Sequence, residues 1–238
     1  MILTVNIGNT HITIAGYEHD TLQFSGRLHS SPAATVDEYA MNLLSLLSLY
    51  QVAPERIEGG ILGSVVPALT GRVLGALRMF CSARFLTVGP GLKSGIKLRL
   101  DNPAQLGGEL LCAIVGALQH CTPPCVVVNF DTATTLLAVD TTGALVGGAI
   151  LPGPQCSLGA LIRNTAQLPQ VELEARPRKL LGTNTADCLH SGIVYGTAAM
   201  LDGMVAQIRG MLGASEAPVV ATGTLPDSVR AACTTEIH

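Results

Sequence analysis

A strand–turn–strand pattern that occurs twice constrains the fold of this chain more than any other feature. Residues 5–10 read Val-Asn-Ile-Gly-Asn-Thr, and residues 128–134 read Val-Asn-Phe-Asp-Thr-Ala-Thr. In each copy a β-branched run ends in small, turn-forming residues and then resumes as a second strand. Backbone N–H groups and hydroxyls at such a turn are suited to hold a phosphate. The two copies therefore predict two lobes that face one nucleotide.

The residues around the first copy predict a lobe that covers residues 1–120. Asp101-Asn102-Pro103 is a helix start, because a capping residue comes before a proline at the first helical position. The other segments follow strand or helix periodicity. The expected strands lie at 1–5, 11–17, 21–28, 60–66 and 84–88, and the expected helices at 35–50, 67–81 and 101–120.

Residues 121–238 repeat this opening. Aligning Asn6 with Asn129 superposes the two hairpin units, and the matched order of strands and turns favours an internal duplication. The expected elements of this second lobe are a strand from Val126, strands at 136–139, 144–150 and 219–221, and helices at 157–166 and 186–212.

Two lobes that each hold a β-meander followed by helices and further strands are typical of the duplicated actin/hexokinase-like (ribonuclease H-like) architecture. We therefore expect an α/β fold in which each lobe is a mixed sheet with helices. Residues 1–120 would carry the first phosphate loop and residues 121–238 the second.

The composition is apolar, with 48% hydrophobic and 13% charged residues, and indicates large buried surfaces such as an oligomer interface. The net charge is −3, with no basic block, so nucleic acid and anionic membranes are poor candidate partners. No apolar stretch approaches the ~18 residues of a membrane span. Asn6 interrupts the N-terminal apolar run too early for a signal peptide, so we expect a cytoplasmic protein.

The seven cysteines do not form a disulfide pattern, since their number is odd and no Cys-x-x-Cys pair occurs. We expect buried thiols in a reducing compartment. The segment 121–125, Cys-Thr-Pro-Pro-Cys, is better explained as a linker between lobes than as a metal knuckle. The histidines show no metal-ligand spacing.

Short motifs lie in a fixed order along nearly the whole chain. They are Asn-Ile-Gly-Asn-Thr at 6–10, Ser-Val-Val-Pro at 64–67, Asp-Asn-Pro at 101–103, Gly-Gly-Glu-Leu at 107–110, Asn-Phe-Asp-Thr-Ala-Thr-Thr at 129–135, Gly-Gly-Ala-Ile-Leu-Pro-Gly at 147–153, Thr-Ala-Gln-Leu-Pro at 165–169, Gly-Thr-Asn-Thr at 182–185 and Thr-Gly-Thr at 222–224. Each is weak alone, but in this order and spacing they resemble the type III pantothenate kinases.

The resemblance implies ATP-dependent phosphorylation of pantothenate, the first step of coenzyme A biosynthesis, by a homodimer. It also implies magnesium and a monovalent cation, potassium or ammonium. Glu109 stands at the position of the family's catalytic base. The other implied site residues are Asn6, Gly8, Asn9, Thr10, Thr13, Thr132, Thr134 and Gly223 for ATP, Leu100, Gly107, Gly108, Leu110, Thr165 and Thr185 for pantothenate, and Asn129 and Asp131 for the cations.

Several of these positions depart from the family pattern. The family's three active-site aspartates are Asn6, Glu109 and Asn129 here, its arginine and tyrosine are Leu110 and Leu100, and a glycine is Asp131. An asparagine keeps the shape of an aspartate but lacks the charge that holds a hydrated magnesium ion. Glu109 is still a carboxylate that can act as a base. In the turn, Asp131 would replace the charge lost at Asn129.

Purely structural interpretations stay open for these residues. Asn6 and Asn129 also fit strand-end turns, Asp131 an Asx turn, and Glu109 a solvated helix position. Thr165 and Thr185 also fit helix caps. Three functions follow: a pantothenate kinase, a catalytically impaired relative with a binding or regulatory role, or a kinase for a different hydroxyl acceptor.

Overall fold

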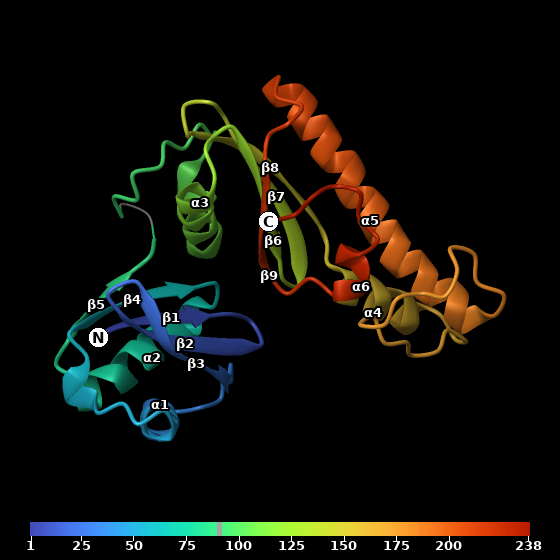
Figure 1. Cartoon of the computed structure of the whole chain (residues 1–238). Helices are drawn as coiled ribbons and strands as arrows, with labels where there is room; N and C mark the ends of the chain where they lie inside the picture. Colours follow the sequence, from blue (N-terminus) through green and yellow to red (C-terminus); the bar gives the residue numbers. More distant parts are fainter. Residues whose placement is uncertain (90–91) are drawn as a thin grey trace. The chain divides into compact units, whose positions relative to one another are not determined.

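The computed structural model describes residues 1–89 and 92–238. By its contacts the chain divides into two compact units, Met1–Leu92 with Ala104–Leu111, and Lys93–Pro103 with Cys112–His238 (Figure 1). The division predicted between residues 120 and 121 stays a prediction.

The first unit contains a five-stranded sheet. Its strands are β1 (Ile2–Ile7), β2 (His11–Glu18), β3 (Thr21–His29), β4 (Gly59–Ser64) and β5 (Arg84–Thr87), in the order β3-β2-β1-β4-β5. The first three form an antiparallel meander, and β4 and β5 run parallel to β1 and to each other. All five predicted strands are confirmed, with ends that differ by one or two residues.

One face of this sheet forms the core of the unit with α1 (Val36–Leu49) and α2 (Pro67–Phe80). Alternation along β1 buries Leu3, Val5 and Ile7 in this core, while Ile2 and Asn6 on the opposite face are exposed. The helix α1 begins at a capping box, in which the Thr35 hydroxyl accepts from Glu38 N–H and the Glu38 carboxylate accepts from Thr35 N–H. A short 3₁₀ helix, η1 (Pro54–Arg56), was not expected from the sequence.

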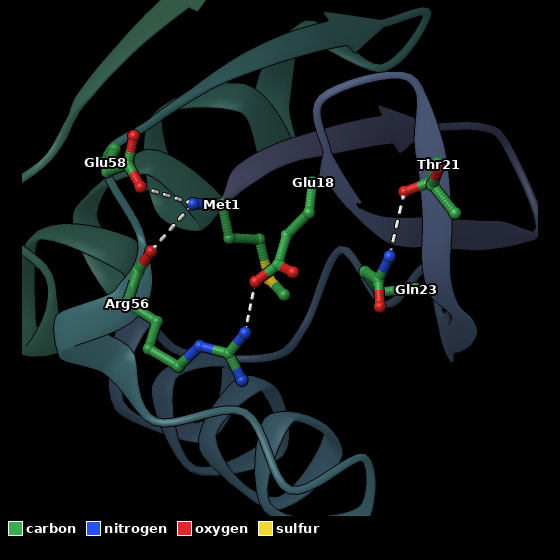
Figure 2. A network of polar contacts seen from close by, with 6 residues as sticks. All are labelled: Met1, Glu18, Thr21, Gln23, Arg56 and Glu58. Atoms are coloured by element: carbon green, nitrogen blue, oxygen red, sulfur yellow. Dashed lines mark hydrogen bonds and ion pairs between the residues drawn. The ribbon is translucent and has the colours of Figure 1, made fainter.

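At the end of the first sheet that lies opposite the β1–β2 turn, polar contacts join segments that are far apart in the sequence (Figure 2). The Met1 amino group donates to Glu58 Oε1 at 2.7 Å and to the Arg56 carbonyl at 3.0 Å. This amino group holds the pKa of Glu58 below its ordinary value. Arg56 also pairs with Glu18 at the end of β2, so the contacts join β1, β2 and the segment before β4.

The second unit contains a four-stranded sheet with the same connections. Its strands are β6 (Cys125–Phe130), β7 (Ala133–Val139), β8 (Leu145–Pro152) and β9 (Val219–Gly223), in the order β8-β7-β6-β9. This order reproduces β3-β2-β1-β4. One hydrogen bond is also repeated: Val65 N–H donates to the Ile7 carbonyl at 3.0 Å, and Thr224 N–H donates to the Phe130 carbonyl at 2.9 Å. The duplication expected from the sequence is therefore present in topology and in local geometry.

The helices of the second unit are α4 (Pro154–Asn164), α5 (Thr185–Leu212) and the short α6 (Asp227–Arg230), which was not expected. The core combines one face of β6 with α5, through Val126, Val128, Ile193 and Val194 among others. The C-terminal tail returns to this core, since His238 exchanges backbone hydrogen bonds with Val219 and Ala221 of β9.

The continuous helix expected at 101–120 is wrong. The structure has a 3₁₀ helix, η2 (Pro103–Gln105), followed by α3 (Gly108–His120). The first α-helical hydrogen bond runs from Leu111 N–H to the Gly107 carbonyl. Two successive glycines lose more conformational entropy in a helix than other residues do, which explains the break at this point.

The expectation of buried thiols is only partly correct. All seven cysteines are free thiols, but only Cys81 and Cys125 are buried, and Cys112 and Cys188 are exposed. Burial, together with the neighbouring Cys121 thiol, raises the pKa of Cys125 to about 12. Within the described residues, no helix has the length and apolar character needed to span a membrane.

Candidate functional site

The first predicted phosphate loop is the tight turn between β1 and β2. Gly8 N–H donates to the His11 carbonyl at 2.9 Å. Ser30, directly after β3, fixes the same turn twice: its hydroxyl donates to the Gly8 carbonyl at 2.7 Å, and its N–H donates to the Thr10 carbonyl at 2.9 Å. The turn is therefore held by β3 as well as by its own strands.

Asn9 and Thr10 form the exposed tip of this turn. Among the described residues, neither backbone N–H donates a hydrogen bond within the chain. Exposed N–H groups on a rigid turn are the donors that phosphate oxygens accept from. The turn therefore carries backbone donors of the kind that can hold a phosphate group.

A polar row crosses the open face of the first sheet beside this turn. Asn6 pairs in register with Thr13 of β2 and with Gly63 of β4, and Thr13 pairs with Arg27 of β3. Register partners point to the same face of a sheet. Asn6 Oδ1 lies 3.7 Å from the point where a Cβ on Gly63 would stand, so the glycine leaves room beside the amide.

The second predicted loop is the turn between β6 and β7, and it is packed more closely. Asp131 N–H donates to the Ala133 carbonyl, and Gly153 N–H donates to the Thr132 carbonyl, both at 3.0 Å. A Cβ on Gly153 would lie 2.6 Å from the Asp131 carbonyl oxygen. A Cβ on Gly223, where φ is +90°, would lie 1.9 Å from the Phe130 carbonyl oxygen. Only glycine fits at these two positions.

The two asparagines occupy equivalent strand positions in different surroundings. Asn6 is exposed, whereas Asn129 is 6% exposed and pairs in register with Thr135 of β7 and Thr222 of β9. One face of the second sheet therefore carries a row of neutral oxygen-bearing side chains. Asp131 lies two residues further along, exposed in the turn with Thr132.

Thr134, predicted to contact ATP, has a different position from the exposed turn residues. It is fully buried, and its hydroxyl has no hydrogen-bond partner among the described residues. Its register partner is Phe130, which belongs to the core shared with α5. The second turn therefore presents Asp131 and Thr132 to solvent, while Thr134 faces the interior.

The candidate base Glu109 is the second residue of α3 and is half-buried. Negative charge is favoured in the first turn of a helix. The preceding residue, Gly108, packs closely against Val88, since a Cβ on Gly108 would lie 3.0 Å from Val88 Cγ1. Gly107 and Leu110 flank this pair and are half-buried too, and Leu100 lies in the segment that follows the bridge between Leu98 and Leu145.

The helix-cap interpretation applies to Thr165 but not to Thr185, because the neighbouring Asn184 is the cap there. Thr165 is the C-cap of α4, and its hydroxyl donates to the Leu161 carbonyl at 2.8 Å. The N-cap of α5 is Asn184, whose side chain accepts from Asp187 N–H at 2.9 Å, and Thr185 is the first helical residue. The side chain of Thr185 is thus not needed as a cap.

Two hollows adjoin the start of α5. One, of about 160 Å³, is lined by Arg178, Lys179 and His190 among others. The other, of about 430 Å³, is lined by Leu180, Leu181, Ser191 and Tyr195 among others. Sequence reasoning gave the lining residues at 178–181 no role, since they lie in a segment without strand or helix periodicity.

The sequence also missed Ser30, which fixes the first turn, and Gly63, which leaves room beside Asn6. Gly153 stood in the motif at 147–153, but its close packing on the second turn was not expected. Their signal lies in strand pairing and close approach, which no local pattern records. Among the described residues, no group of three or more His, Cys, Asp or Glu side chains is arranged to hold a metal ion. Asp131 is the carboxylate that the second turn itself supplies, and the first turn supplies none.

The comparisons by sequence agree on one family. The family model described as Type III pantothenate kinase matches residues 2–207. A type III pantothenate kinase of Roseiflexus castenholzii is 37% identical over 231 residues, which cover 97% of this chain and 90% of that protein. One of Halalkalibacterium halodurans is 35% identical over 229 residues, covering 94% and 88%.

Among solved structures, a putative 2-dehydro-3-deoxygalactonokinase from Sinorhizobium meliloti superposes with a TM-score of 0.58 at 11% identity. The superposition covers 100% of this chain and 91% of that one. At this identity the likeness concerns the fold alone. It agrees with the predicted α/β, actin/hexokinase-like class of two mixed sheets with helices.

Proposed function

The chain belongs to the type III pantothenate kinase family, and we propose from this membership that it transfers the γ-phosphoryl group of ATP to pantothenate. This reaction begins coenzyme A biosynthesis. The observation that carries the proposal is the match of the family over residues 2–207 together with more than a third identity to curated members. The comparisons do not favour the alternatives of an impaired member or a different acceptor.

In the proposed reaction Glu109 accepts the proton of the pantothenate hydroxyl. The hydroxyl oxygen forms a bond to the γ-phosphorus, and the bond from that phosphorus to the β,γ-bridging oxygen breaks, which releases ADP. The ATP contacts we propose are the turn residues Asn9, Thr10 and Thr132, whose N–H and hydroxyl groups suit phosphate oxygens.

Family membership implies ATP and a divalent metal ion, and we propose magnesium. A divalent ion would neutralise phosphate charge during transfer. Magnesium needs one or two carboxylates beside the phosphate oxygens. The exposed Asp131 fits this role at the second turn, but the amide of Asn6 does not fit it at the first turn.

We place the monovalent cation, potassium or ammonium, at Asn129. Neutral oxygens are suitable ligands for potassium. Asn129, Thr135 and Thr222 share one face of adjacent strands and supply such oxygens.

The substrate contacts proposed from the family stay proposals. They are Leu100, the two glycines and the leucine that flank Glu109, and the threonines at the end of α4 and at the start of α5. Both leucines lack the charge or hydroxyl of the family residues, so the carboxylate of pantothenate needs other partners. The residues are Leu100, Gly107, Gly108, Leu110, Thr165 and Thr185.

A homodimer belongs to the same proposal. In the second unit Ile150, Leu180 and Leu181 are 76%, 65% and 80% exposed. Large exposed apolar side chains mark protein interfaces. A cytoplasmic location is proposed too, because seven free thiols suit a reducing compartment.

The test is an ATP- and magnesium-dependent assay of the purified chain with pantothenate, coupled to ADP release and checked by mass of the product. Phosphopantothenate formation supports the proposal. If the wild type is inactive but Asn6→Asp with Asn129→Asp restores turnover, the chain is an impaired member. Turnover only with other hydroxyl compounds would indicate a changed acceptor.

A further inference from the structure

Three nitrogen-bearing side chains lie on β2 and β3 next to the first turn and have no role in the proposed reaction. His11 begins β2, and Arg27 and His29 lie at the end of β3. We call these three residues the basic rim. All three side chains are exposed.

Strand pairing brings the rim together. His11 and His29 are direct register partners, and their rings meet edge to face with centroids 6.4 Å apart. Arg27 is the register partner of Thr13. Alternate residues of a strand share a face, so the rim lies on the face that carries Asn6 and Thr13.

The rim is fixed to the turn itself. Ser30, the residue after His29, donates its hydroxyl to the Gly8 carbonyl and its N–H to the Thr10 carbonyl. The end of β3 therefore cannot move independently of the turn. The ion pairs found among the described residues do not include Arg27, so no carboxylate there offsets its charge.

The row of Asn6, Thr13 and Arg27 lacks the carboxylate that a divalent metal ion requires. The position equivalent to a metal-holding carboxylate is the neutral Asn6, and the nearest charged group in its row is the guanidinium of Arg27. A guanidinium repels a divalent cation but binds phosphate oxygens in pairs, with charge-assisted hydrogen bonds. Imidazole N–H groups also donate to such oxygens.

We propose that the basic rim binds the phosphate chain of the nucleotide at the first turn, and that it supplies there the positive charge which Asn6 cannot recruit through a metal ion. The proposal rests on the proposed function only in taking ATP as the nucleotide. It assigns Arg27 and His29 to the nucleotide site.

The experiment is calorimetric titration of the full chain with ATP in EDTA, so that no divalent ion contributes. The wild type is expected to bind ATP without metal. Arg27→Gln is expected to raise the dissociation constant about tenfold or more, the effect of one lost charge-assisted hydrogen bond. His29→Gln should weaken binding less, and adenosine, which has no phosphates, should bind all variants equally.

Arg84→Gln is the matched control. Arg84 is exposed and lies on the same face of the same sheet, in the row of Ile2 and Gly59. That row is about 13 Å along the strands from Asn6. The control should bind ATP as the wild type does, and circular dichroism should show all variants folded.

Equal ATP affinity of folded Arg27→Gln and wild type would overturn the proposal, as would a wild type that binds no ATP without metal. The kinase assay gives an independent result. If Arg27→Gln weakens ATP binding and pantothenate is not phosphorylated, the basic rim stands and the proposed acceptor fails.

Discussion

Asn6 and Asn129 are the same residue at equivalent positions, yet their surroundings give them different chemistry. The exposed amide of Asn6 stands in a row that ends in Arg27, whereas Asn129 is buried in a row with two threonines. The first row is suited to an anion and the second to a weakly hydrated cation. The duplicated sequence pattern alone could not distinguish them, because burial and register come from the two different sheets.

Glu109→Gln tests the assignment of the base. The amide keeps the size of the side chain but cannot accept the hydroxyl proton, so we expect phosphate transfer to pantothenate to slow by about 10²–10⁴-fold. ATP binding should change little. The rate is measured by the coupled ADP assay, with the exposed Glu55→Gln as control. A rate within threefold of the wild type would contradict the assignment.

Gly223→Ala tests how closely the second turn is packed. A methyl group would lie 1.9 Å from the Phe130 carbonyl oxygen on a backbone with φ +90°, so β9 must move away from β6. We expect a loss of roughly 2–4 kcal/mol in unfolding free energy, measured by urea denaturation.

Gly203→Ala is its control. Gly203 is an exposed position inside α5 where an added methyl meets nothing within 4 Å. It should stabilise the chain by about 0.5–1 kcal/mol. Equal stability of both variants would show that the turn does not require glycine.

At the scale of elements, the chain uses one strand arrangement twice. It consists of a meander with a tight turn between its first two strands and a further strand parallel to the first. In both copies the N–H of the residue after this parallel strand donates to the carbonyl of the last residue of the first strand. The helices differ, since α1 and α2 cover the first sheet while the long α5 packs on the second. In the second unit the tail contributes as well. Asp202 of α5 accepts from the N–H groups of Thr234 and Thr235, each at 2.8 Å.

This tail contact predicts a pH dependence of stability. Burial alone would raise the pKa of Asp202, but hydrogen bonds from Thr234 and Thr235 outweigh it, and the pKa lies below its ordinary value. A carboxyl with a lowered folded-state pKa stabilises the fold above its unfolded pKa of about 3.9, and this contribution disappears as pH falls through the folded pKa.

Asp202→Asn should therefore lower the melting temperature at pH 7, and the difference from the wild type should shrink between pH 4 and lower values. Thermal unfolding followed by circular dichroism from about pH 3 to pH 7 measures it. A difference that stays constant over this range would mean that the ionised carboxylate does not hold the tail.

At the scale of the whole molecule, the apolar composition is only partly accounted for by the two cores. The second unit leaves Ile150, Leu161, Leu180 and Leu181 exposed, and a hollow of about 430 Å³ adjoins the last two. An interface between two copies would bury such a surface, which is the reason for expecting a dimer.

Leu181→Glu is expected to convert the proposed dimer into a monomer, because it places a charge in an apolar contact. Size-exclusion chromatography with light scattering gives the mass. Met79→Glu, at another large exposed apolar side chain, on α2 of the first unit, should leave the mass unchanged. A wild type that is monomeric at micromolar concentration would contradict the prediction.

The sequence by itself determined the duplicated strand–turn–strand units, most element bounds and the family, because these depend on local periodicity, turn-forming residues and motif order. Only the tertiary structure decided the rest. It separated the exposed Asn6 from the buried Asn129, paired His11 with His29 beside the first turn, and required glycine at positions 153 and 223 through contacts with Asp131 and Phe130. It also divided the helix expected at 101–120. These features depend on strand register and on close approach between segments far apart in the chain, which no local pattern encodes.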